Sequence, residues 1–180
     1  MRIVVQRVSE AEVSVAGDVI ARIGRGLLLF VGCARGDDEA AAVWLAHKIA
    51  GLRVFADDAG LMNADLAAVR GQVLAVPQFT LLGDCRKGNR PSFAHAMEPS
   101  AATLLFDRFV AHLATRVGPV PTGRFGAAMQ VRLTNDGPVT RPRALACAGT
   151  ARMSAGRSGQ RYRLFPCHRE TKRGSVAPVP

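Results

Sequence analysis

The sequence lacks the features of membrane, secreted and metal-binding proteins. No stretch of its 180 residues approaches the roughly 18 consecutive apolar residues that cross a bilayer. The first residues enter an alternating apolar pattern directly, without the basic segment and apolar core of a secretory signal. The cysteines are scattered, without the paired spacing of zinc sites or disulfide frameworks; they are Cys33, Cys85, Cys147 and Cys167. We therefore expect a cytoplasmic protein with reduced thiols, no metal and no other cofactor.

Common catalytic patterns are also scarce. No glycine-rich phosphate loop follows a strand, because residues 24–26 are too short for one and are typical of a hairpin turn. His47 and His112 lie inside helical patterns, and only His95 lies in a loop near other polar residues. The thiol of Cys85 has no histidine at a spacing that indicates nucleophilic catalysis. A conventional nucleophile and base are therefore not evident.

The chain is long enough for one domain with a real hydrophobic core. Hydrophobic residues make up 48% and charged residues 21% of it, as in globular proteins. The net charge of +10 is uneven: residues 141–180 hold nine lysines and arginines against one acid, whereas residues 1–140 hold 15 against 13. The later segment is rich in Arg, Ala, Gly, Ser and Pro without apolar periodicity. We therefore predict a folded domain at 1–140 and a basic, disordered tail at 141–180.

Apolar residues in the first 140 positions follow both strand and helix periods. Apolar runs between glycine-containing turns predict strands; these lie at residues 3–8, 11–15, 19–23, 26–31, 53–55, 73–76, 124–125 and 129–133. Helical spacing follows three consecutive acids at 37–39 and again follows Pro99-Ser100. These periods predict a mixed α/β domain.

The loop after the apolar run 73–76 carries the one dense basic cluster of this domain. Arg86, Lys87 and Arg90 lie close together in sequence, with Gly88 between them. Cationic side chains beside a glycine suit phosphate oxygens, because side-chain and backbone donors can then reach the same group. The cluster is therefore a candidate site for the phosphates of a polyanionic partner, and a solvated loop explains its composition equally well.

A second unusual segment runs from residue 135 to residue 140. Its Gly137-Pro138 pair is typical of a turn, and an X-Pro bond also has access to the cis form. Together with Gln78-Phe79-Thr80-Leu81 and the basic loop, in this order, the segment resembles the D-aminoacyl-tRNA deacylase family, of the D-tyrosyl-tRNA deacylase type. The resemblance extends over residues 1–140 and includes residues 6–8, 24–32, 52–55, 62–63 and 122–127.

The resemblance implies an enzyme that hydrolyses the ester of D-aminoacyl-tRNA, and of glycine on the wrong tRNA, as a proofreading step. It also implies a metal-free homodimer in which two small mixed β-sheets are layered with helices on one side. In the family, the segment matching Gln78-Phe79-Thr80 lines the pocket and offers backbone N–H groups. The unit matching Gly137-Pro138, in the cis form, enters from the partner subunit as a chiral gate, and Arg7 resembles the arginine that steadies it.

Three departures from the family pattern leave alternatives open. Pro77 stands where the family usually has Ser, Ala128 stands where Asp is common, and a basic tail follows Thr140. A proline at the pocket edge lacks both a hydroxyl and a backbone N–H. One alternative is therefore a catalytically weakened tRNA-binding module, which would bind tRNA through the basic cluster of Arg86, Lys87 and Arg90 and through the tail. Another is a general esterase that uses Cys85 or Thr80 on small substrates.

Overall fold

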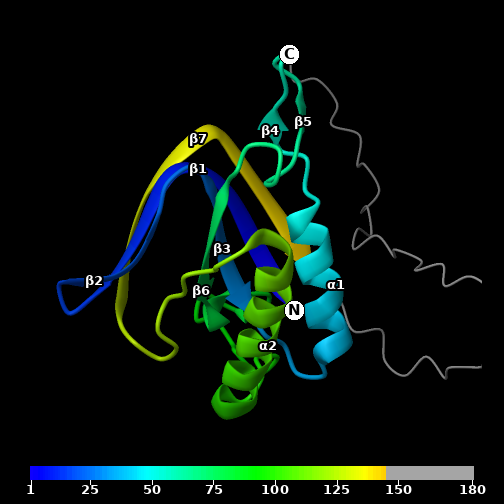
Figure 1. Cartoon of the computed structure of the whole chain (residues 1–180). Helices are drawn as coiled ribbons and strands as arrows, with labels where there is room; N and C mark the ends of the chain where they lie inside the picture. The colour runs from blue at the N-terminus through cyan, green and yellow to red at the C-terminus, as the bar shows by residue number, and fades with distance from the viewer. Residues whose placement is uncertain (145–180) are drawn as a thin grey trace, which may run out of the picture. The chain divides into compact units, whose positions relative to one another are not determined.

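The structure, a computed structural model, describes residues 1–144 (Figure 1). The strands are β1 (Arg2–Val15), β2 (Asp18–Ile23), β3 (Gly26–Gly32), β4 (Phe55–Ala56), β5 (Met62–Ala64), β6 (Gln72–Pro77) and β7 (Met129–Ala144). The helices are α1 (Glu39–Ala50), the short 3-10 helix η1 (Phe79–Leu82) and α2 (Pro99–Val117). Most of the predicted tail, residues 145–180, lies outside the described residues.

Strand β1 organises the larger sheet, because its two halves pair with different partners. Its first half, residues 2–8, runs antiparallel to β3, and its second half, residues 11–15, runs antiparallel to β2. Strand β7 pairs antiparallel with both halves, and β6 runs parallel to β3. β1 and β7 bend together, so the sheet curls (Figure 1). The separate strands predicted at 3–8 and 11–15 are thus one continuous strand.

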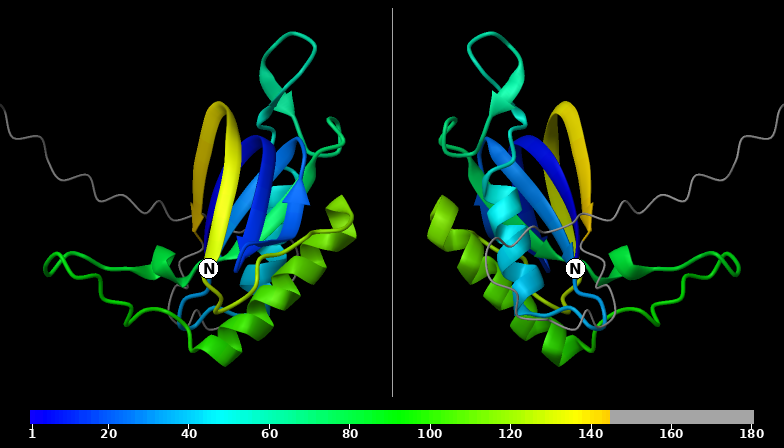
Figure 2. Two further views of the ribbon diagram at one scale, coloured as in Figure 1. Left: turned by 90° about the vertical axis from the view of Figure 1, so that its left-hand side faces the viewer. Right: turned by 90° about the vertical axis from the view of Figure 1, so that its right-hand side faces the viewer.

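Successive side chains of this sheet point to opposite faces, and each face contributes to a separate hydrophobic core. Leu27 and Leu29 belong to the core shared with α1 and α2, whereas Leu28 belongs to the core enclosed by the curled sheet. α1 lies behind the sheet in one view and in front of it in the opposite view (Figure 2). A second, two-stranded sheet pairs β4 with β5. The predicted α/β fold class, with two sheets and helices, is confirmed, although only the curled sheet is mixed and the small sheet is antiparallel.

The predicted helices form at the expected places because their caps and apolar stripes agree. The Asp38 side chain caps α1 by accepting a hydrogen bond from the Ala41 N–H at 2.9 Å. Pro99 opens α2 at a position where its missing N–H costs no helical hydrogen bond. The buried residues of α2 follow helical spacing; they are Ala102, Leu105, Phe106, Phe109 and Leu113. No helix within residues 1–144 has the length and apolar character needed to span a membrane.

A buried ion pair anchors the start of β1. The Met1 ammonium group contacts the Asp37 carboxylate, and both side chains are almost completely buried. Asp37 also accepts a hydrogen bond from the Ala34 N–H at 2.6 Å. Because a buried charge is tolerated only when it is paired and hydrogen-bonded, this pair fixes the strand against the turn before α1.

Two sequence predictions require correction. No strand forms at residues 124–125; the turn there follows Thr122, which makes an isolated bridge to Ala75. Strand β7 also continues beyond residue 140, since Arg141 pairs with Val5 and Ala144 with Arg2. Residues 141–144 therefore belong to the sheet rather than to a disordered tail.

Candidate active site

The segment Gln78-Phe79-Thr80 lies where β6 leaves the sheet. The Gln78 N–H donates to the Val31 carbonyl at 2.7 Å, which continues the parallel pairing of β6 with β3. The chain then turns directly into η1, which begins at Phe79. Residues that leave the C-terminal end of parallel strands commonly line ligand sites in open sheets. The segment is thus held by the sheet on one side and open on the other.

The backbone donors of this segment are available. Among residues 1–144, the N–H groups of Phe79 and Thr80 donate no hydrogen bond, as expected for the first turn of a helix. The Gln78 side-chain amide donates to the Thr80 hydroxyl oxygen. No described acid, histidine or lysine accepts a proton from that hydroxyl. The segment therefore offers N–H donors to a ligand but no activated side-chain nucleophile.

An aromatic cavity of about 550 Å³ lies against Phe79. Its walls include Phe79, Phe93 and Phe125, and we call it the aromatic cavity. The rings of Phe79 and Phe93 meet edge to face with centroids 5.0 Å apart, and Phe79 is 57% exposed. A large exposed aromatic ring beside a cavity is typical of a binding site for a flat apolar group. Pro77 also lines this cavity.

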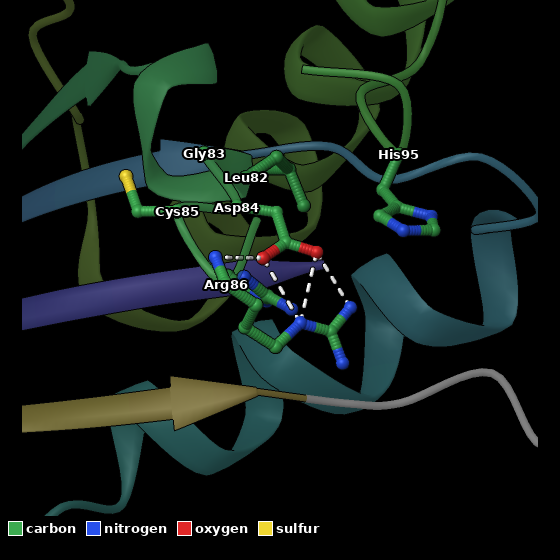
Figure 3. A pocket seen from close by; sticks show the side chains of 7 residues that line it. Leu82, Gly83, Asp84, Cys85, Arg86 and His95 are labelled. Carbon is green, nitrogen blue, oxygen red and sulfur yellow. Dashed lines mark hydrogen bonds and ion pairs between the residues drawn. The ribbon is translucent and has the colours of Figure 1, made fainter. Parts of the chain in front are cut away.

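The cysteines do not form a catalytic site with these groups. Cys33 lines the aromatic cavity, but burial raises the pKa of its thiol to about 11, so the nucleophilic thiolate is scarce. Cys85 and His95 both line a second cavity of about 640 Å³, where the Cys85 sulfur points away from His95 (Figure 3). No hydrogen bond joins them among the described residues. This geometry gives no support to an esterase based on Cys85.

The basic cluster divides into one paired and two unpaired side chains. Asp84 takes two hydrogen bonds from the Arg86 Nε, at 2.9 and 3.0 Å, and an ion pair from Arg86 Nη2 (Figure 3). These contacts with Arg86 hold the pKa of the Asp84 carboxyl well below its usual range. Lys87 and Arg90 are exposed and form no ion pair within residues 1–144. Their donors are free for phosphate groups, whereas those of Arg86 are largely occupied.

Residues 136–139 form an insert in the β1–β7 ladder. Gln6 pairs with Thr140 and Val8 pairs with Asn135, so the four residues between them oppose Arg7 alone. This arrangement is a large β-bulge, and bulges often redirect the chain next to functional sites. The Gly137-Pro138 peptide is cis. The turn expected from Gly-Pro is therefore an insert within a long strand.

Arg7 braces the insert. Its Nε donates to the Asp136 carbonyl at 2.9 Å and lies 3.2 Å from the Asp136 carboxylate, and its Nη1 donates to the Val54 carbonyl. The Arg7 side chain is only 12% exposed. Gly137 has a φ of +118°, and a Cβ at this position would lie 2.6 Å from Arg7 Nη2. Only glycine combines this backbone conformation with so close a guanidinium.

Within one chain, the insert and the Gln78-Phe79-Thr80 segment lie beside different residues of β1. Val31, which accepts the Gln78 N–H, pairs with Ile3, whereas the insert faces Arg7. Four residue steps along β1 correspond to about 13 Å at the usual strand rise. The residues that line the aromatic cavity include neither Gly137 nor Pro138. A single chain therefore does not bring the insert to the cavity.

A family model described as D-Tyr-tRNA(Tyr) deacylase matches residues 4–142. The chain belongs to this family. A relative from Sorangium cellulosum, named D-aminoacyl-tRNA deacylase, is 60% identical over 141 residues, which cover 78% of this chain and 94% of the relative. Another of that name, from Thermomicrobium roseum, is 55% identical over 140 residues, covering 78% of this chain and 91% of the relative. The family predicted from the sequence is confirmed.

Two solved structures are also similar. One, titled c-Myc DNA Unwinding Element Binding Protein, is 37% identical, with a TM-score of 0.77, and the match covers 82% of this chain and all of the other. The second, a probable eukaryotic D-amino acid tRNA deacylase, is 18% identical, with a TM-score of 0.68, and the match covers 79% of this chain and 97% of the other. At this identity the second likeness shows a shared fold.

Sequence reasoning missed the walls of the aromatic cavity. Phe93 and Phe125 come from loops far apart in the sequence and meet Phe79 only in the folded chain. The resemblance included their segments, but no local pattern indicated that their rings share a cavity. Glu98 was likewise passed over, although it precedes Pro99 at the start of a predicted helix and also lines the cavity.

Proposed function

We propose that the protein hydrolyses the ester bond of D-aminoacyl-tRNA, and of glycine attached to the wrong tRNA, releasing the amino acid and tRNA. The observation that carries this proposal is the aromatic cavity beside the two free N–H groups of η1, in a chain of the deacylase family. A terminal adenosine can stack in such a cavity, since single-stranded bases bind on aromatic side chains. Its ester then lies near Phe79 and Thr80. We place the reaction in the cytoplasm, where aminoacyl-tRNA is used.

Catalysis by backbone donors accounts for the scarcity of acids and bases. Water attacks the ester carbonyl carbon, and the N–H groups of Phe79 and Thr80 stabilise the negative charge that forms on its oxygen. Each well-aimed donor contributes roughly 3 to 4 kcal/mol to such a transition state. The C–O bond to the ribose then breaks, and the ribose oxygen takes a proton that originates from the water. The adjacent ribose hydroxyl relays this proton, so Thr80 needs no covalent role.

A homodimer completes this site. The insert does not line the cavity of its own chain, so a partner related by a two-fold axis is needed to supply it. β7 offers a surface for such a partner: the alternating residues Met129, Val131 and Leu133 stay half-buried, and β7 pairs only with β1 among the described strands. Unpaired apolar strand edges are surfaces that proteins usually cover. A symmetric contact would place each insert in the other chain's site.

The insert then selects the chirality of the substrate. Gly137 and Pro138 carry no ionisable group, and Arg7 holds the preceding residue in place. A rigid backbone at the α-carbon clashes with an L side chain, whereas a D side chain or a hydrogen points elsewhere. Discrimination at the α-carbon leaves the rest of the D side chain free to vary.

The exposed part of the basic cluster contributes affinity for tRNA. Lys87 and Arg90 have no described ion-pair partner, and their loop begins directly after η1. Phosphate contacts from such residues orient an RNA without reading its sequence. Arg86 contributes less, because Asp84 already neutralises its charge.

Release of amino acid from matched substrates tests the proposal. The purified full chain is incubated with D-tyrosyl-tRNA, L-tyrosyl-tRNA and glycine on an alanine tRNA, and free amino acid is followed with time. We expect turnover of the D and glycine esters, with the L ester hydrolysed at least about 100-fold more slowly, which corresponds to roughly 2.7 kcal/mol. Binding without turnover would favour the weakened tRNA-binding module, for which Pro77 in the cavity wall is the specific observation. Hydrolysis of simple esters without RNA would favour the esterase.

A further inference from the structure

Glu98 is the only acidic residue among the lining of the aromatic cavity. One of its carboxylate oxygens, Oε2, caps α2 by accepting the N–H groups of Ser100 at 3.0 Å and Ala101 at 3.2 Å. The Ser100 hydroxyl donates to the same oxygen. The other oxygen, Oε1, accepts no hydrogen bond from residues 1–144. The cap therefore orients the side chain while one oxygen keeps its full capacity to accept.

No cation within residues 1–144 forms an ion pair with this carboxylate. Arg35 lines the same cavity, but its Nε donates to the Ala96 carbonyl at 3.3 Å, and no ion pair joins it to Glu98 among the described residues. The hydrogen bonds from Ser100 lower the pKa of the Glu98 carboxyl. Glu98 therefore stays ionised at neutral pH and acts only as an acceptor.

The ionised Glu98 carboxylate, in a cavity lined by three phenylalanines, suits a nucleobase whose edge carries an amine. Aromatic walls hold a base by its faces, and discrimination between bases then depends on polar groups at its edge. A carboxylate accepts from an exocyclic amine and is repelled by a carbonyl oxygen at the same position. Adenine presents an amine at C6, whereas hypoxanthine presents an oxygen there.

We propose that Glu98 selects adenine at the 3′ end of the substrate by accepting a hydrogen bond from its 6-amino group. This inference rests on the proposed function, which places the terminal nucleoside in the aromatic cavity with its ester near Thr80. The base beside Phe79 then belongs to the nucleoside whose ribose carries the amino acid, because Phe79 and Thr80 are adjacent in η1. Glu98 is a binding residue here and takes no part in the chemical step.

The test uses D-tyrosyl-tRNA in which the terminal adenosine is replaced by purine riboside, which lacks the amine, or by inosine, which has a 6-oxo group. For the unmodified chain, we expect kcat/KM to fall about ten-fold with purine riboside, because one hydrogen bond to a charged group is lost. With inosine we expect a larger fall, since the carboxylate then faces an oxygen. The loss should appear mainly in KM.

Three variants separate base recognition from helix capping. In Glu98→Ser the cap is kept, because serine is a good N-cap, but the reach into the cavity is lost, and the three substrates should react at similar rates. In Glu98→Gln the side-chain amide can donate, so turnover of the inosine substrate should rise relative to the adenosine substrate. Ser100→Ala removes a partner of the cap but not the free oxygen, and should keep the preference for adenosine.

The outcomes distinguish the two proposals. If the unmodified chain does not hydrolyse the adenosine-terminated D ester, the proposed function fails. If it hydrolyses all three substrates equally, the deacylase function stands and adenine selection by Glu98 is overturned. A preference that persists unchanged in both Glu98→Ser and Glu98→Gln, with unaltered thermal unfolding, would also overturn it.

Discussion

The two ends of the first half of β1 are both anchored by a cation, which is buried at Met1 and partly buried at Arg7, but they present different surfaces. At the start of the strand, the Met1 ammonium group contacts Asp37 beneath the turn before α1. Six residues on, in the part of β1 that faces the insert, Arg7 binds backbone carbonyls and braces the insert. The first anchor lies near Ile3, whose partner Val31 holds the chain that leads into η1, and the second lies beside the insert.

This difference matches the two tasks that we propose. The η1 segment, which we propose as the catalytic part, must admit a substrate. The N–H groups of Phe79 and Thr80 accordingly have no acceptor among the described residues, and the Phe79 ring is exposed. The insert, which we propose as the selective part, must exclude an L-aminoacyl ester of nearly the same size as the D-aminoacyl ester. Its backbone must therefore keep its position. In this account the braced backbone belongs to the insert, which excludes the wrong substrate. The accessible groups belong to η1, where the reaction takes place.

The largest expected effect concerns the first anchor. Asp37→Asn removes the negative charge that contacts the buried Met1 ammonium group, and we expect the free energy of unfolding to fall by about 3 to 5 kcal/mol. Denaturant unfolding followed by circular dichroism measures this change. Arg108→Ala, which breaks an exposed ion pair with Glu39, is the matched control and should have a much smaller effect. Equal effects of the two substitutions would show that the buried pair is not an anchor.

Disturbing the second anchor should damage activity more than stability. Gly137→Ala places a Cβ 2.6 Å from Arg7 Nη2 at a positive φ, so the insert must shift. We expect hydrolysis of D-tyrosyl-tRNA to fall by about 100-fold, as a displacement of about 1 Å can do. Gly17→Ala is the control, because Gly17 has a similar φ of +93° but open space around it. Equal activity of the two variants would contradict a positioning role for Gly137.

A substitution at the edge of the aromatic cavity should increase catalytic activity. Pro77 ends β6 and lines the aromatic cavity, and Pro77→Ser supplies a hydroxyl and an N–H where the family usually has them. One additional hydrogen bond corresponds to an increase in kcat/KM of about three-fold. Steady-state kinetics with D-tyrosyl-tRNA measures it. Equal or lower turnover would mean that the proline is already accommodated by the site.

The smallest effect concerns the loop that follows η1. Lys87→Ala should lower the slope of log affinity against log salt by about one unit, because one phosphate contact is lost. The double variant Asp84→Ala with Arg86→Ala removes a neutral pair and should leave the slope nearly unchanged. Binding of uncharged tRNA at several salt concentrations measures both slopes. A larger change in the double variant would assign the phosphate contact to Arg86.

Local patterns predicted those parts of the fold that local forces determine. The helix at 99–117 follows from Pro99 and from apolar spacing, both visible in the sequence. The strand expected at 124–125 was wrong because Phe125 lies in a turn between two glycines and contributes to the aromatic cavity instead. The insert was expected as a turn because Gly-Pro has that preference locally. Its place inside β7 depends on pairing with β1, which lies more than a hundred residues away.

The candidate site was predictable only through the family resemblance. No spacing of acids, bases or nucleophiles indicates a reaction that depends on backbone N–H groups, because every residue except proline carries such a donor. Glu98 shows the same limit. In the sequence it is a helix cap, and only the folded cavity shows that one of its oxygens remains available.

Mixing two inactive variants tests most directly whether the insert of one subunit and the η1 donors of the other form one site across a dimer. Gly137→Ala spoils the insert, and Thr80→Pro removes one of the two backbone donors; each should be nearly inactive alone while remaining folded and dimeric. If the insert acts in the partner's site, random exchange of subunits gives one intact site in half of the dimers. The mixture should then recover about a quarter of the D-tyrosyl-tRNA hydrolysis of the unmodified protein. No recovery after demonstrated subunit exchange would contradict the account and place the insert and the η1 donors in separate roles.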